Sequence, residues 1–126
     1  MAFPKTQNLD YYRGDTFEFK VYPKNQDGTN FDLSVFETFT FKIANQRGAG
    51  ATQYTGAAVK ASETDPQTGL DVDFVKCTIT PTVGRTLSAT DYFYDVQITD
   101  TTPTPNVIYT LLTGKIIVTD DVTGAV

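Results

Sequence analysis

Apolar and polar residues alternate at every second position over much of the chain, the pattern of strands with one buried face. The alternation recurs in segments that begin at Leu9, Phe17, Phe39 and Val75. It is clearest in the segment that starts at Tyr92, where two sets of residues face opposite ways: Tyr92, Tyr94, Val96 and Ile98 on one side, and Phe93, Asp95, Gln97 and Thr99 on the other. A last strand is expected over about 107–118, with a break near its glycine, Gly114.

Turn-forming residues separate these segments. Turns are predicted at residues 13–15, 25–28 and 65–69, and a loop is predicted around Pro103 and Pro105. The Gly-, Ala- and Thr-rich stretch 47–56 predicts a loop or a short edge strand. The adjacent apolar pair Phe74-Val75 breaks the alternation, so a bulge or a change of sheet is expected there. A single helical turn is expected around 83–87.

Seven to eight short strands, about 10–15 residues apart, favour an all-β fold over alternating helices and strands. We therefore expect an immunoglobulin-like antiparallel β-sandwich, with a small up-and-down barrel as the structural alternative. The length of 126 residues suits one domain. The expected organisation is an N-terminal arm at 1–8, the sandwich at 9–120 and a C-terminal tail at 121–126.

Charge and composition exclude several classes of protein. The net charge is −5 and no cluster of Lys or Arg interrupts it, which argues against binding to nucleic acid. No stretch approaches the roughly 18 apolar residues of a membrane span, and no apolar signal region follows the N-terminus. The single cysteine, Cys77, excludes an internal disulfide and suits folding in a reducing cytoplasm.

Groups able to perform catalysis are scarce. Without histidine, the usual Ser-His-Asp and Cys-His arrangements cannot form. Cys77 lies in an alternating strand and is expected to be a buried, inert thiol. Asp71 and Asp73 share a strand face and could hold Ca²⁺ or serve as an acid–base pair, although a solvated face is the simpler interpretation. We therefore predict no catalytic, cofactor or metal site and no enzymatic activity.

Two features of the strand at 92–98 have candidate roles. Tyr92 lies near the start of the second-to-last strand, where immunoglobulin-like sandwiches often have a tyrosine that bonds back to upstream backbone. It is the candidate for this tyrosine corner. On the outward side, Phe93, Asp95 and Gln97 form a possible contact patch, and Phe3 in the N-terminal arm is a further candidate contact.

Several short motifs carry a resemblance to a known family. They are Tyr92-Phe93-Tyr94-Asp95-Val96-Gln97, Thr110-Leu111-Leu112-Thr113-Gly114 leading to Asp120-Asp121-Val122-Thr123, Arg13-Gly14-Asp15-Thr16-Phe17, and Asp27-Gly28-Thr29 before Phe31-Asp32-Leu33-Ser34. With these motifs the chain resembles small immunoglobulin-like virion proteins of tailed bacteriophages. The resemblance implies a structural protein that is made in the host cytoplasm and located in the virion. It would be oligomeric in the assembled particle, with the major capsid protein or tail and baseplate proteins as partners.

Within that family, capsid decoration or cementing is favoured, because the sequence stops soon after its Asp-Val-Thr motif where baseplate versions continue. A baseplate, tail or neck adaptor is the alternative. A carbohydrate- or host-surface-binding sandwich is an alternative of another class. Such sites usually stack sugars on exposed aromatic residues, often Trp, and this chain has seven Tyr and no Trp.

Overall fold

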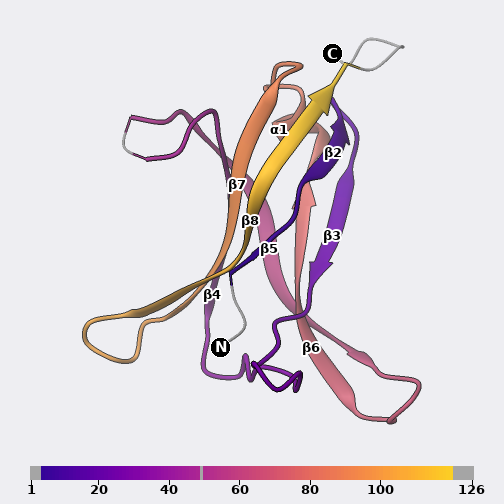
Figure 1. Cartoon of the computed structure of the whole chain (residues 1–126), viewed down its shortest axis with the longest axis vertical. Helices are drawn as coiled ribbons and strands as arrows, with labels where there is room; N and C mark the ends of the chain where they lie inside the picture. Colours follow the sequence, from indigo (N-terminus) through magenta and orange to yellow (C-terminus); the bar gives the residue numbers. More distant parts are fainter. Residues whose placement is uncertain (1–3, 49, 121–126) are drawn as a thin grey trace.

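The computed structural model describes residues 4–48 and 50–120 and is almost entirely β-structure (Figure 1), which confirms the all-β prediction. Phe3 and the predicted tail at 121–126 lie outside the described residues. The elements, in chain order, are β1 (Lys5–Thr6), β2 (Leu9–Tyr12), β3 (Phe17–Val21), β4 (Thr38–Ala44), β5 (Gln53–Thr64), β6 (Asp71–Ile79), α1 (Pro81–Gly84), β7 (Asp91–Asp100) and β8 (Val107–Thr119).

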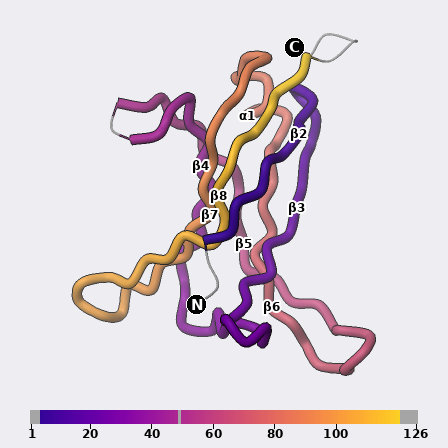
Figure 2. Tube along the Cα trace, viewed as in Figure 1, coloured from indigo at the N-terminus to yellow at the C-terminus, as the bar shows by residue number. Residues whose placement is uncertain are grey.

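The strands form one curled sheet in the order β1-β8-β7-β4-β5-β6-β3, with β2 also paired to β8. The long strand β5 joins the two halves of this sheet. Its residues 53–56 pair with β4, and its residues 57–64 pair with β6. The connections β4–β5, β5–β6 and β7–β8 extend away from the body (Figures 1 and 2).

The sheet is mixed, which corrects the prediction that all its strands are antiparallel. Both N-terminal strands, β1 and β2, run parallel to β8, whereas every other pairing is antiparallel. After β2 the chain turns and returns as β3, which pairs with β6 instead of with its sequence neighbour. Alternation along a strand marks its buried face but carries no information about its neighbours, so the parallel pairs could not be foreseen.

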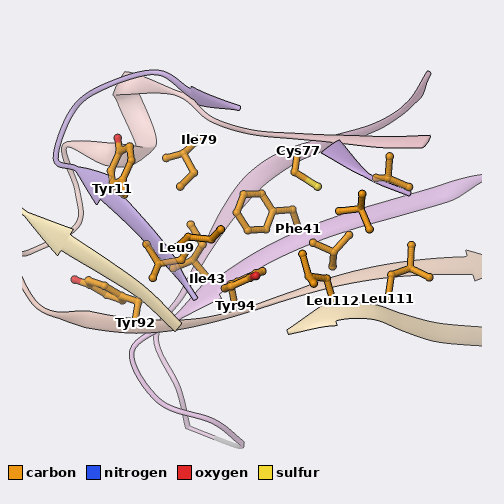
Figure 3. Close-up of a cluster of buried hydrophobic side chains, with 14 of the residues drawn as sticks. Leu9, Tyr11, Phe41, Ile43, Cys77, Ile79, Tyr92, Tyr94, Leu111 and Leu112 are labelled. Carbon is orange, nitrogen blue, oxygen red and sulfur yellow. The ribbon is translucent and has the colours of Figure 1, made fainter. Parts of the chain in front are cut away.

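The curled sheet folds back on itself around a core rich in aromatic rings (Figure 3). The ring of Phe19 on β3 lies 5.3 Å from that of Phe41 on β4 and 6.1 Å from that of Tyr94 on β7, measured between centroids. Most inward positions expected from the alternation are buried: Leu9, Tyr11, Val21, Phe41, Ile43, Val75, Cys77, Ile79, Tyr92, Tyr94, Val96 and Ile98. Phe17, Phe19 and Phe39 are half-buried and pack against this core.

The irregularity expected at Phe74-Val75 is absent. Strand β6 keeps an unbroken register with β5 through this pair, and its pairing with β3 begins at Val75. Val75 points into the core, and Phe74 is buried on the outer face, where the Lys20 ammonium lies 4.9 Å from its ring centroid and the Tyr22 ring packs at 5.3 Å. Neighbouring apolar residues can thus face opposite sides when both sides are covered.

The bulge lies instead in the β7–β8 pair. The register shifts between Val96 and Gln97, and the consecutive residues Leu111 and Leu112 are both buried. Strand β8 also continues through Gly114, so the predicted break there is wrong. An added Cβ at Gly114 would lie 2.1 Å from the Gln7 carbonyl oxygen, so the glycine permits the close approach of the N-terminal segment.

Two further expectations need adjustment. Within the stretch 47–56, residues 53–56 already belong to β5, which runs for twelve residues, longer than the short edge strand that the Gly and Ala content suggested. The single helical turn is present but begins earlier, at Pro81, after the N-cap Thr80. Proline at the first helical position and a threonine cap explain this start.

Candidate functional site

Two adjoining depressions, of about 210 and 150 Å³, form a groove on the outer face of β4 and β7. Lys42, Gln53 and Asp95 line both depressions. The predicted contact residues Phe93, Asp95 and Gln97 all lie in this groove. The structure therefore brings three members of the predicted patch together, and the fourth, Phe3, lies outside the described residues.

Strand geometry explains why these side chains face outward. In β7 the even-numbered positions from Tyr92 to Ile98 are buried, so the odd-numbered positions point away from the core. Lys42 of β4 pairs directly with Asp95, which places both side chains on the same face. The Lys42 ammonium donates a hydrogen bond to Thr55 Oγ1 at 2.8 Å, which anchors it beside the groove.

Arg47, from the β4–β5 loop, lines the groove and lies over the ring of Phe93. Its guanidinium carbon lies 4.9 Å from the Phe93 ring centroid, and its Nη1 lies 3.7 Å from Asp95 Oδ1. Its Nη2 donates to Thr113 Oγ1 at 3.0 Å, and the Thr113 hydroxyl donates to Asp95 Oδ1 at 2.6 Å. A connected network therefore holds Phe93, Asp95 and Thr113 in place.

The groove is locally cationic on a chain whose net charge is −5. Lys42 and Arg47 line it, the Lys115 ammonium lies 5.8 Å from the Phe93 centroid, and Asp95 is the one acidic residue among the described lining residues. The Arg47 and Asp95 side chains are 53% and 41% exposed, so their ion pair is weak. Both remain accessible to a partner, and an acidic group is the best match for this charge.

The sequence did not identify Arg47, Lys42, Thr113 or Lys115 as part of this site. Arg47 lies in a Gly-rich loop far along the chain from Phe93, and nothing in the local pattern links them. Only the pairing of β4, β7 and β8 brings these residues together.

Tyr92 lies on the opposite, buried face of β7 and belongs to the scaffold. Its hydroxyl accepts a hydrogen bond of 2.8 Å from the Ser88 amide, four residues upstream, and its ring packs edge-on against Tyr54. Tyr94, the next inward residue, donates from its hydroxyl to the Gln7 carbonyl at 2.6 Å, and burial raises its pKa to about 12. These two tyrosines fasten loop and N-terminal backbone to β7.

The other candidate reactive groups have structural environments. Cys77 is fully buried, and burial raises the pKa of its thiol to about 12, so the nucleophilic thiolate is scarce at neutral pH. Asp71 and Asp73 accept hydrogen bonds from the hydroxyls of Thr64 and Ser62 on β5. In the described ranges, 4–48 and 50–120, no group of three or more Asp, Glu or Cys side chains is arranged to hold a metal ion.

The Arg13-Gly14-Asp15 turn also has a structural role. The Arg13 side chain donates to two backbone carbonyls that follow α1, from Nε to Leu87 at 2.7 Å and from Nη2 to Arg85 at 2.9 Å. The turn thereby anchors the segment after α1 to the end of β2.

Among the residues that the structure describes, no helix is long and apolar enough to cross a membrane. In comparisons with known proteins, no family model matches the chain, and no curated protein or solved structure is significantly similar to it.

Proposed function

We propose that this chain is a non-enzymatic structural protein of a tailed-bacteriophage virion, which docks on the particle exterior through the groove of β4 and β7. The resemblance of its strand and turn motifs to small virion proteins supports a place in the virion. The supply of chemical groups supports a binding role, because the described lining residues offer cations, amides, a hydroxyl and one carboxylate, and the chain has no histidine to act on them as a general base.

The finer fold belongs to the same proposal: an immunoglobulin-like sandwich in which β2, β8, β7 and β4 form one layer and β6 and β3 form the other. Strand β5 would pass from the first layer to the second. The contact between Phe19 and Phe41 across the core supports two facing layers. The hydrogen bond from the Ser88 amide to the Tyr92 hydroxyl supports a tyrosine corner.

The single observation that carries the docking role is the Arg47 network. Arginine and aromatic side chains dominate the binding energy of many protein interfaces. Here Arg47 and Phe93 are held against each other before any partner arrives, so less side-chain freedom is lost on binding. The cationic surroundings favour an acidic partner surface, which the repeating lattice of a major capsid protein can present many times.

Capsid decoration or cementing is the placement we propose, with a baseplate, tail or neck adaptor as the alternative within the virion. Binding of a carbohydrate is less well supported by the geometry, because Arg47 lies over the ring of Phe93. A sugar would have to displace that guanidinium before it could stack on the ring.

The test is reconstitution on particles that lack the protein. Purified chain should rebind with fixed stoichiometry, and labelling in electron micrographs should mark the capsid. Arg47→Glu should weaken binding roughly tenfold or more, because it reverses charge at an arginine contact. Lys60→Glu is the matched control, since Lys60 is exposed on β5 and lines none of the groove. It should change the affinity less than about twofold, because an exposed charge outside the contact is largely screened by salt.

Three outcomes would reject the docking role as proposed. They are failure of the wild-type chain to rebind, equal rebinding by Arg47→Glu, and a strong, specific signal on a glycan array. Equal melting temperatures of the two variants would establish that a loss of binding is not a loss of folding. Tail or baseplate labelling would move the placement to the adaptor alternative.

A further inference from the structure

The hairpin that joins β5 to β6 extends away from the body of the protein (Figures 1 and 2). Its residues 62–73, which we call the acidic hairpin, include four acidic residues and neither Lys nor Arg: Glu63, Asp65, Asp71 and Asp73. Its two strands stay paired as far as Thr64 and Asp71, the last residues before the turn. The acidic hairpin therefore presents its negative charge on a paired, two-stranded support outside the core.

Two carboxylates of the acidic hairpin share one face. Asp71 and Asp73 are two residues apart on β6, so their side chains point to the same side, about 7 Å apart along the strand. Each carboxylate accepts a hydrogen bond through Oδ1 from a hydroxyl of β5. Among the described residues, no Lys or Arg forms an ion pair with either one. Glu63 lies on the other face and already contacts Lys20, so the free pair is Asp71 and Asp73.

The groove of β4 and β7 has two lysines with a matching offset. Lys42 of β4 pairs with Asp95 of β7, and Lys115 of β8 pairs with Phe93 of β7. The two lysines therefore lie two residues apart along β7, again about 7 Å. Neither ammonium forms an ion pair with a carboxylate of the described residues. Asp95, by contrast, is already paired with Arg47, so the uncompensated charge of the groove is positive.

We infer that the groove binds the acidic hairpin of a second copy of this chain, with Asp71 and Asp73 facing Lys42 and Lys115. The argument is charge complementarity between two surfaces of one chain, each with two charges at the same spacing along a strand. The acidic hairpin belongs to the β5–β6 half of the sheet and the groove to the β4–β7 half. Every copy therefore offers both surfaces to its neighbours.

This contact would regulate the groove. A copy whose groove holds the acidic hairpin of another copy cannot dock through that groove, so self-association and docking would compete. The inference rests on the groove that we propose for docking, but not on the virion as its setting.

Sedimentation equilibrium of the purified chain tests the contact. At about 0.05 M salt, the weight-average mass should rise as the protein concentration increases to about 1 mM, a range in which weak association is measurable. At about 0.5 M salt the rise should largely disappear, because salt screens exposed charges.

Charge-reversal variants then identify the two surfaces. The hairpin variant is Asp71→Lys with Asp73→Lys, and the groove variant is Lys42→Glu with Lys115→Glu. Each variant alone should associate at least about tenfold more weakly than the wild type, because like charges then meet. A mixture of the two should recover association, because the acidic hairpin of the groove variant meets the unchanged lysines of the hairpin variant.

The matched control is Asp15→Lys with Glu18→Lys, which changes the net charge as much as the hairpin variant does. Both residues are exposed and lie outside the acidic hairpin and the groove. The control should change the association less than about twofold. Melting temperatures show whether each variant folds. Should the hairpin variant fail to fold, Asp71→Asn with Asp73→Asn takes its place, with an expected loss of about threefold.

The inference is overturned by any of three results. These are a mass that stays monomeric at low salt, undiminished association of a folded hairpin or groove variant, and a mixture of these two variants that does not recover association. The hairpin variant keeps the groove intact and should rebind particles at least as well as the wild type. Normal rebinding without self-association would reject this inference alone, whereas self-association without rebinding would reject the docking role alone.

Discussion

Gly56 marks the point where β5 leaves β4 and begins to pair with β6, and the ring of Phe41 packs directly on it. The two residues are opposite each other in the β4–β5 pair. An added Cβ at Gly56 would lie 2.3 Å from Cδ2 and 2.8 Å from Cε2 of that ring. Phe41 cannot easily move away, because it is fully buried and contacts the rings of Phe19 and Tyr94.

Gly56→Ala should therefore destabilise the fold. Overpacking of a well-filled core costs about 1–3 kcal/mol. Alanine recovers about 0.5–1 kcal/mol, because glycine loses more backbone freedom on folding. A clash this short belongs at the upper end of the cost, so the expected net loss is about 2 kcal/mol. With an unfolding entropy of about 2.1 cal/mol/K per residue, a chain of 126 residues should melt about 8 °C lower.

Urea unfolding followed by tyrosine fluorescence, together with a thermal melt, measures this loss. The control is a double-mutant cycle with Phe41→Leu, which removes the ring at its own cavity cost. In that background Gly56→Ala should cost less than about 0.5 kcal/mol, because the contact has gone. An unchanged melt of the single variant, or an equal cost in both backgrounds, would refute the proposed packing.

Three further predictions follow from buried polar groups. Tyr92→Phe removes the hydroxyl that accepts from the Ser88 amide and should lower the free energy of unfolding by about 1 kcal/mol without weakening docking. An unchanged melting temperature would contradict the assignment of Tyr92 as a tyrosine corner. Cys77 should resist Ellman's reagent at about pH 8 in the native protein and react at once in guanidinium, since its pKa is raised to about 12; rapid native reaction would contradict its burial. Tyr94 has its pKa raised from 10.0 to about 12, so the folded form holds a proton that the unfolded chain releases. The stabilisation that this bound proton gives to the folded form is complete below pH 10 and is lost as the pH rises toward 12. Urea titrations over this pH range should therefore show a falling free energy of unfolding in the wild type and a flatter profile in Tyr94→Phe.

The fold class followed from the sequence because burial on one face of a strand imposes a period of two on the residues. The buried residues of β4, β6 and β7 were identified in this way, down to the single thiol of Cys77. Segments without that period were interpreted less well. Strand β5, whose residues from Gln53 to Thr64 are none of them fully buried, turns Tyr54, Gly56 and Ala58 toward the core, and two of these are too small to give an apolar signal.

The candidate site was found only in part for a related reason. Phe93, Asp95 and Gln97 share one outward strand face, so the local pattern was enough to group them. Lys42 and Arg47 come from β4 and the loop that follows it, and Lys115 comes from β8 on the other side of β7. Contacts between distant segments depend on which strands pair, and a period along one strand does not encode that choice.

The sequence by itself determined that the chain forms strands, which side of most strands is buried, and where most turns lie, because these are local consequences of side-chain alternation and turn chemistry. The tertiary structure alone decided that the N-terminal strands run parallel to β8 and that β5 joins the two halves of the sheet. Those features arise from long-range pairing, in which each strand edge and apolar face is covered by whichever segment the whole fold brings to it.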